Sequence, residues 1–121
     1  MATIMIVDDS AVMRKNIKVI LERGGHEIVA EASDGREVLT RYINHRPDLV
    51  TMDISMVNVD GIEALQTLIR SFPTAKVVMI SALGQKQQVL EAIKSGAKSY
   101  IVKPFEAEKM LQIIGKVLLA P

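Results

Sequence analysis

The stretch Ile4-Met5-Ile6-Val7-Asp8-Asp9 decides the fold of this chain, because four apolar residues run directly into two carboxylates. A short apolar run of this kind is typical of a strand buried on both faces of a parallel sheet. The same design returns in LVTMD at 49–53 and in VVMIS at 77–81, which are apolar and end in a polar side chain. We therefore predict that these three segments are the central strands of one sheet.

Amphipathic segments with helical spacing of apolar residues separate these runs. Gly24-Gly25, Pro47 and Gly96 mark helix ends, and Asp60 is expected to cap the third helix. The alternating run 27–32 is typical of an edge strand. The expected strands are 4–7, 27–32, 48–53, 76–81 and 99–103, and the expected helices lie around 13–21, 38–43, 62–72, 89–93 and 110–118. This alternation predicts an α/β fold: a doubly wound, five-stranded parallel sheet of order 2-1-3-4-5, the flavodoxin-like (βα)5 arrangement.

Composition narrows the class of protein. A length of 121 residues suits one domain, so residues 1–121 are expected to form a single unit. The chain has no cysteine, which excludes disulfides and thiolate metal sites. Its apolar runs are too short to span a membrane and its N-terminus has no signal-peptide pattern, so we expect a cytoplasmic protein. Residues 85–121 carry six lysines and three glutamates, a basic bias too weak to imply nucleic-acid binding.

Polar side chains stand at the carboxyl end of nearly every expected strand: Asp8-Asp9, Asp53, Ser81 and Lys103. Ligands of open parallel sheets bind at this edge, near the point where the strand order reverses. Three carboxylates in one place raise each other's pKa, and a hard cation relieves that repulsion. Mg²⁺ suits such an open acidic cluster, and Mn²⁺ is the alternative. The backbone carbonyl of Ser55 would complete the ligands, and Asp53 could then act as a nucleophile toward a phosphoryl group.

Taken singly, these residues have ordinary explanations. Asp8-Asp9 could be part of a helix cap, and Asp53 and Ser81 could be turn residues. Lys103 alone would more often be a solvated strand end. Only the combination at one edge of the sheet favours a functional site.

Five short motifs contain these residues and follow one another along the chain. They are Ile6-Val7-Asp8-Asp9-Ser10, Met52-Asp53-Ile54-Ser55-Met56, Asp60-Gly61, Ser81-Ala82 and Val102-Lys103-Pro104-Phe105. In these motifs the sequence resembles response-regulator receiver domains over its whole length, most closely the stand-alone chemotaxis (CheY-like) kind. The strand order 2-1-3-4-5 is that of the same family, so it is not an independent prediction.

The resemblance implies roles for the site residues. Asp53 is the phosphoacceptor, and Asp8 and Asp9 belong to the magnesium site, Asp9 directly and Asp8 mainly through water. Lys103 contacts the phosphoryl oxygens. Ser81 is the switch hydroxyl that follows the phosphoryl group.

The resemblance also implies roles for several residues around the site. Tyr100 is the aromatic switch residue that changes rotamer, and the bond before Pro104 is the candidate for a cis peptide. Val57 departs from the family, which usually has proline there, and this puts the rigidity of the acceptor loop in question. Ser55 and Leu83 occupy positions that are thought to tune the phosphoryl lifetime.

The expected function is that of a phosphorylation-activated switch in a two-component system. The resemblance to CheY-like receivers implies that this system serves chemotaxis. A histidine kinase would be the phosphodonor, and the output partner, such as a flagellar motor component, would bind the face of the fourth helix, fifth strand and fifth helix. Lysines 86, 94, 98, 109 and 116 lie on or near this face and could meet an acidic partner or be simply solvated. The protein would be a monomer and not an enzyme, although it would assist its own phosphorylation and dephosphorylation.

Four alternatives stay open at this point. The chain could be a single-domain phosphorelay intermediate or a receiver excised from a longer regulator, although its end just past Leu119 suits a stand-alone protein. A haloacid-dehalogenase-type hydrolase would need a second acid at position 55, which is serine. A flavodoxin-like cofactor binder would need a phosphate-cradling loop where Asp8-Asp9-Ser10 stands.

Overall fold

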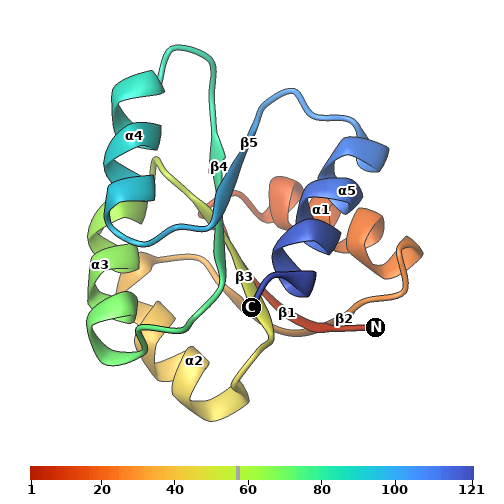
Figure 1. Cartoon of the computed structure of the whole chain (residues 1–121), viewed down its shortest axis with the longest axis horizontal. Coiled ribbons are helices and arrows are strands. Elements are labelled where there is room, and N and C mark those ends of the chain that lie inside the picture. The colour runs from red at the N-terminus through yellow and green to blue at the C-terminus, as the bar shows by residue number, and fades with distance from the viewer. Residues whose placement is uncertain (57) are drawn as a thin grey trace.

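A five-stranded parallel sheet organises the chain, in the order β2-β1-β3-β4-β5 that the sequence predicts. The computed structural model describes residues 1–56 and 58–121. The strands are β1 (Thr3–Val7), β2 (Glu27–Ala32), β3 (Leu49–Asp53), β4 (Val77–Ser81) and β5 (Ser99–Val102). The α-helices are α1 (Ala11–Arg23), α2 (Val38–His45), α3 (Gly61–Ser71), α4 (Lys86–Lys94) and α5 (Ala107–Leu119). Figure 1 shows α2, α3 and α4 on one side of the sheet and α1 and α5 on the other.

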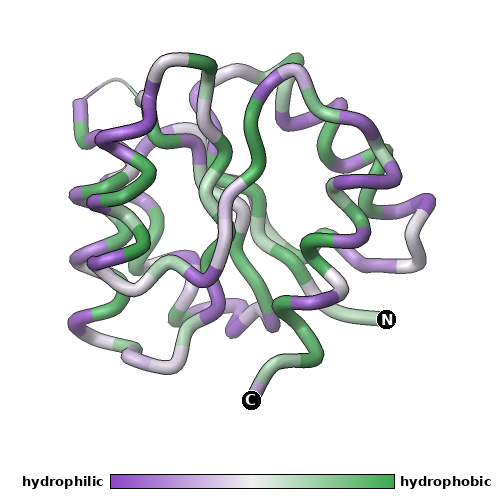
Figure 2. The backbone as a smooth tube through the Cα atoms, turned by 45° about the horizontal axis from the view of Figure 1, so that its top comes forward, coloured by the Kyte–Doolittle hydropathy of each residue, from purple (hydrophilic) through white to green (hydrophobic). Residues whose placement is uncertain are grey.

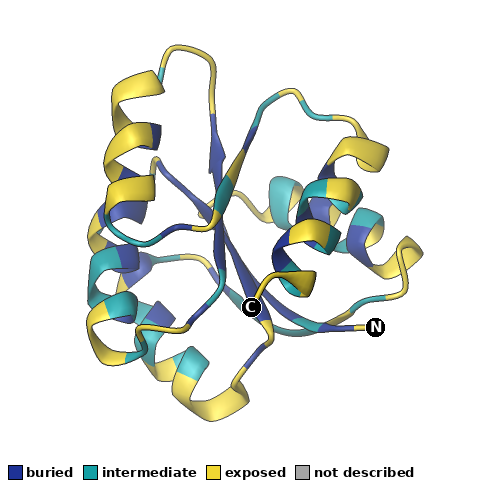
Figure 3. Cartoon of the chain, in the orientation of Figure 1, coloured by how far each residue is buried: buried dark blue, intermediate teal, exposed yellow. Residues whose placement is uncertain are grey.

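The central strands are buried from end to end. Every residue of β3 and β4 is buried, and β1 is buried except at Thr3. Helices on both faces take these side chains out of water, which explains why the runs are apolar without alternation. The edge strands β2 and β5 are mostly half-buried, as Figure 3 shows by colour.

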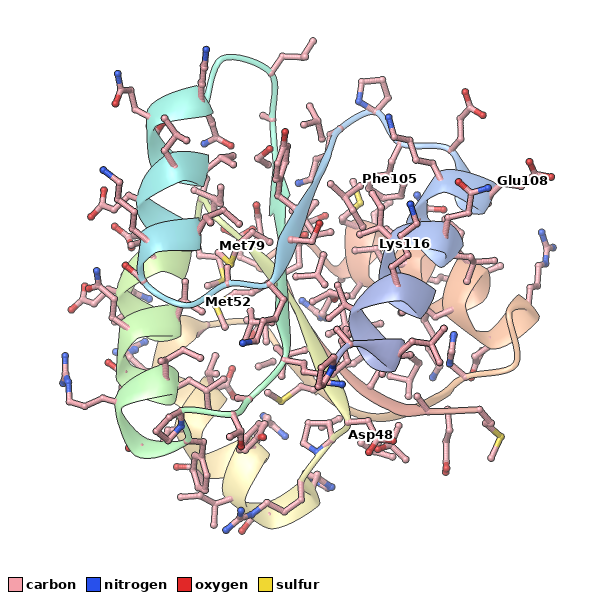
Figure 4. All side chains as sticks on the ribbon, in the orientation of Figure 1. Asp48, Met52, Met79, Phe105, Glu108 and Lys116 are labelled. Carbon is pink, nitrogen blue, oxygen red and sulfur yellow. The ribbon has the colours of Figure 1, made fainter. Side chains whose placement is uncertain are left out.

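Two apolar layers pack against the opposite faces of the sheet. Met52 and Met79, both fully buried, belong to the layer under α2, α3 and α4, where Figure 4 labels them. Ile6 and Ile80 belong to the layer under α1 and α5. In Figure 2 the green apolar segments run along the inner strands, while purple segments dominate the outer turns of the helices. Successive side chains of a strand point to opposite faces, so each central strand contributes to both layers.

Local signals set the helix starts. The Ser10 hydroxyl accepts a hydrogen bond from the Met13 N–H and caps α1, and the Asp60 carboxylate caps α3 through the Glu63 N–H. Gln85 stands at the N-cap of α4, yet its side chain makes no capping hydrogen bond to that helix. The side chain of Gln85 is used elsewhere.

The sequence-based boundaries differ from the structure in a few places. The strands β3 and β4 begin one residue later than expected, and β5 ends at Val102 rather than at 103. A short 3₁₀ helix at Gly35–Glu37, capped by Asp34, was not predicted, because three residues are too few for an apolar period to show. Among the described residues, none of the helices is both long and apolar enough to cross a membrane.

Candidate phosphoacceptor site

The polar residues predicted from the strand ends do converge at one edge of the sheet. Asp53 and Ser81 are the last residues of β3 and β4, while Asp8 and Lys103 directly follow β1 and β5. This edge lies where β4 and β5 run upward in Figure 1. Carboxylate oxygens of Asp8, Asp9 and Asp53 all lie within 4.8 Å of one another. The register explains the convergence, because β1 pairs with β3 and β3 with β4.

Asp8 is buried and only partly satisfied. Its Oδ1 accepts a hydrogen bond of 2.9 Å from the Ser10 N–H, whereas its Oδ2 has no hydrogen-bond partner among the described residues. The Lys103 Nζ lies 3.9 Å from that Oδ2. Burial raises the pKa of the Asp8 carboxyl, and the Ser10 hydrogen bond and the Lys103 charge only partly oppose this rise. A buried oxygen with an unused lone pair is a ready ligand for a cation or its water shell.

Asp53 is the most strongly perturbed acid of the site. Burial, and then the neighbouring Asp8 charge, raise the pKa of its carboxyl to about 6. Two groups oppose this rise: the Lys103 Nζ is 3.7 Å from Asp53 Oδ1, and the Ser55 N–H donates to the same oxygen over 3.3 Å. The dianionic pair Asp8–Asp53 is therefore incompletely compensated by the protein alone, and a divalent cation would complete the compensation.

Asp9 is exposed and faces an open groove of about 460 Å³ beside the acceptor. Ser55 and Gln85 also line this groove. The groove therefore gives water and dissolved reagents access to the edge of the sheet where the buried Asp8 and Asp53 lie. This open geometry suits Mg²⁺, which keeps several waters when it binds few carboxylates.

Gly61 lets the end of β3 lie close to the start of α3. A Cβ at position 61 would overlap the carbonyl oxygen of Asp53 and approach the Ile54 Cα to 2.8 Å. The Gly61 N–H donates to the Ile54 carbonyl over 2.7 Å. The Asp60-Gly61 pair thus has a physical reason: aspartate caps the helix, and glycine admits the backbone of the acceptor strand.

The residues expected to form the switch, Ser81 and Tyr100, lie on β4 and β5, the two strands that follow β3 in the sheet. Ser81 is buried, and its Oγ has no hydrogen-bond partner among the described residues. Tyr100 is 44% exposed and borders a cavity of about 320 Å³ that also reaches Ser81 and Val89. The Lys103–Pro104 peptide bond is cis. The question raised by Val57 lies outside the described residues.

Two contacts of the site were not predicted from the sequence. The Arg14 Nη1 donates to the Asp8 carbonyl over 2.7 Å while its Nε pairs with Glu31 at 3.1 Å, which ties α1 and β2 to the end of β1. The Gln85 side chain bridges the loops after β3 and β4. Arginine and glutamine at helix starts carry no spacing signal of their own, so only the folded geometry identifies them.

Comparison with known proteins defines the class to which this fold and site correspond. Residues 4–115 match the family described as the response regulator receiver domain. The chain belongs to this family, whose members are switches of two-component signalling.

The relatives narrow the class to receivers of the CheY type. The chain is 50% identical over 115 residues to the chemotaxis protein CheY of Bacillus subtilis, covering 95% of this chain and 96% of that protein. It is 44% identical to the chemotaxis protein CheY of Thermotoga maritima, over 94% of this chain and 95% of that protein. A CheX–CheY–BeF3–Mg²⁺ complex from Borrelia burgdorferi matches with a TM-score of 0.92 and 39% identity, covering 98% of this chain and 90% of that one. This similarity confirms the predicted fold and supports a role in chemotaxis signalling.

Proposed function

We propose that Asp53 is the phosphoacceptor of a two-component switch and takes its phosphoryl group from a histidine kinase. The observation that carries the proposal is the buried Asp53 carboxylate, 3.7 Å from the Lys103 ammonium and clustered with Asp8 and Asp9. Nucleophile, cation and metal-ligating acids then occupy one edge of the sheet. The similarity to CheY proteins supports the same assignment.

In the phosphoryl transfer, the Asp53 carboxylate displaces the histidine nitrogen at phosphorus. A carboxylate oxygen of Asp53 forms the new P–O bond while the P–N bond of the kinase phosphohistidine breaks. The electron pair of that bond leaves with the histidine nitrogen, which takes a proton from solvent. Lys103 neutralises part of the charge on the equatorial phosphoryl oxygens.

A magnesium ion fits the donor set of this site. Asp9, Asp53 and the Ser55 carbonyl would hold it directly. Asp8, whose buried Oδ2 has no hydrogen-bond partner within residues 1–56 and 58–121, would act through water. When bound, the ion supplies charge neutralisation for the acids and for the phosphoryl group. Mn²⁺ would satisfy the same oxygen donors.

The signal would leave the site through Ser81 and Tyr100. The Ser81 hydroxyl, which has no hydrogen-bond partner in the described part of the chain, could turn toward a new dianion on Asp53. The cavity that Ser81 and Tyr100 border would let the Tyr100 ring move inward. Two apolar side chains of α4, Leu90 (49% exposed) and Ile93 (41% exposed), line the same cavity as Tyr100 on the α4-β5-α5 face. We propose this face as the output surface, since a phosphoryl group can shift the population of its conformations.

The wider assignment follows from the same relatives. We propose that residues 1–121 act as one monomeric receiver unit in the cytoplasm, phosphorylated by a chemotaxis histidine kinase and read by a partner such as a flagellar motor component. CheX, the partner in the Borrelia complex, illustrates a second kind of binding protein. The chain would catalyse no reaction on a separate substrate, and would only assist phosphoryl transfer to and from its own aspartate.

Phosphorylation by a small phosphodonor tests the proposal directly. With Mg²⁺ present, intact-mass spectrometry should detect one added phosphoryl group on the wild type and none on Asp53→Asn. Asp48→Asn is the matched control, because Asp48 lies at the opposite end of the sheet (Figure 4) and should leave the modification unchanged. Uptake by Asp53→Asn equal to that of the wild type would reject Asp53 as acceptor.

A further inference from the structure

Gln85 joins the two loops that flank the acceptor. Its Oε1 accepts a hydrogen bond of 2.7 Å from the Ala82 N–H, and its Nε2 donates to the Ser55 Oγ over 2.6 Å. Ala82 directly follows the switch candidate Ser81, and Ser55 is two residues after Asp53. Both ends of one side-chain amide are therefore used on backbone and side-chain groups next to the site.

These hydrogen bonds do not serve the helix that Gln85 begins. Gln85 is the N-cap of α4, a position where side chains usually cap the helix, but its side chain makes no such bond. It lies half-buried in the groove that Asp9 and Ser55 also line. Its amide is thus directed at the site rather than at α4.

We propose that Gln85 is a positioning residue that latches the β4–α4 loop to the acceptor loop in the unphosphorylated protein, and so opposes the switch. The proposal rests on the proposed function of Asp53 and Ser81. Among the described residues the Ser81 Oγ has no hydrogen-bond partner that would hold it in place, so resistance to movement must come from its neighbours. Ala82 shares a peptide bond with Ser81 and is the residue that Gln85 holds.

The latch has a defined physical consequence. When the backbone at Ser81 moves toward a phosphoryl group on Asp53, the Ala82 N–H moves with it, and either the Ala82–Gln85 or the Gln85–Ser55 hydrogen bond must stretch. Loss of one neutral hydrogen bond is equivalent to about 1 kcal/mol, or roughly a fivefold change in an equilibrium constant. A ligand that needs the unlatched arrangement binds more tightly by the factor through which that arrangement becomes more populated.

The affinity for Mg²⁺ with beryllium fluoride, the phosphoryl mimic of the Borrelia complex, measures how much more the unlatched arrangement is populated in a variant. Isothermal titration calorimetry should show roughly fivefold tighter binding to Gln85→Ala than to the wild type. Ser55→Ala removes the other partner of the same hydrogen bond but keeps the backbone carbonyl, so it should tighten binding to a similar extent. The double variant should bind no more tightly than either single variant, because all three lack the same bond.

Two controls separate the latch from a general change of stability or surface. Gln88 lines the same groove and, within the described part of the chain, its side chain makes no hydrogen bond, so Gln88→Ala should bind like the wild type. Urea unfolding without ligand should show Gln85→Ala less stable than Gln88→Ala by no more than roughly the same fivefold factor in the unfolding equilibrium constant, because only Gln85 loses hydrogen bonds. A much larger loss would mean a general disruption of the fold and would reject the latch.

The outcomes distinguish the latch from the function on which it rests. Failure of the wild type to bind the mimic or to take up phosphate would reject the proposed function itself. Normal binding by the wild type with equal or weaker binding by Gln85→Ala would reject the latch and leave the acceptor assignment intact. Additive effects in the double variant would likewise reject it, because the two residues would then act independently.

Discussion

Removing the charge of Asp53 should stabilise the fold at neutral pH. Asp53 is 5% exposed, and the pKa of its carboxyl is raised from 3.8 to about 6 by burial and by the Asp8 charge. Because the folded state resists ionisation, the ionised carboxylate destabilises it relative to the unfolded chain. About two pKa units correspond to about 2–3 kcal/mol, so Asp53→Asn should gain up to that amount above pH 6 without divalent cations.

The stability advantage of Asp53→Asn over the wild type should grow as the pH rises. A raised folded-state pKa means that the wild type loses stability as pH rises from about 4 through about 6. Asp53→Asn lacks this loss, so the two proteins should differ least near pH 4 and most above pH 7. For a domain of this size the difference corresponds to a rise in Tm of roughly 10 °C.

Thermal unfolding followed by circular dichroism, in EDTA and across this pH range, is the assay. Asp9→Asn is the matched control, because Asp9 is exposed and contributes least to the rise of the Asp53 pKa. It should give a much smaller gain. Added Mg²⁺ should stabilise the wild type and reduce the advantage of Asp53→Asn, since the ion binds the ionised acids. A variant less stable than the wild type at pH 7.5, or an advantage independent of pH, would refute this reasoning.

Two further predictions concern Gly61, which lies against the backbone of Asp53, and the ammonium group of Lys103. Gly61→Ala should destabilise the fold by about 2 kcal/mol or more, because its Cβ would overlap the Asp53 carbonyl oxygen. Gly115→Ala in α5 should be neutral or gain about 0.5–1 kcal/mol, because beyond its own helix backbone the new Cβ would meet none of the described atoms within 4 Å. Urea denaturation of both variants checks this, and equal stabilities would contradict it. Lys103→Met removes the ammonium that lies 3.7 Å from Asp53, so phosphoryl uptake should slow at least tenfold, while Lys109→Met on α5 should leave the rate unchanged. Kinetics with a small phosphodonor measure this, and an unaltered rate in Lys103→Met would remove that lysine from the site.

The strand pattern made the fold predictable. The runs Ile4–Val7 and 49–52 are apolar without alternation, which placed them at the centre of the sheet, where they are buried. The sheet order was confirmed, but it came together with the resemblance to receiver domains. The predicted boundaries were wrong by one residue at several strand ends, because strand pairing is lost gradually there. Side chains partly replace it: the Asp48 carboxylate, for example, accepts a hydrogen bond from the Thr3 N–H.

The candidate site was predictable as a set of residues but not as a set of interactions. A parallel sheet brings its carboxyl ends to one edge, so Asp8, Asp53 and Lys103 could be grouped from their places in the sequence. The bridge made by Gln85 could not be found in this way. It depends on how the loops after β3 and β4 fold toward each other, which no periodic pattern records.

The sequence by itself determined which chemical groups reach the carboxyl edge of the sheet, because strand periodicity and chain order decide where each strand ends. Only the tertiary structure decided how those groups behave. The pKa of Asp53 rises to about 6 because the folded chain removes water from its carboxyl and brings the Asp8 charge beside it. Hydration and through-space distance are properties of the packed molecule, and residues far apart in the chain acquire them only when the sheet forms.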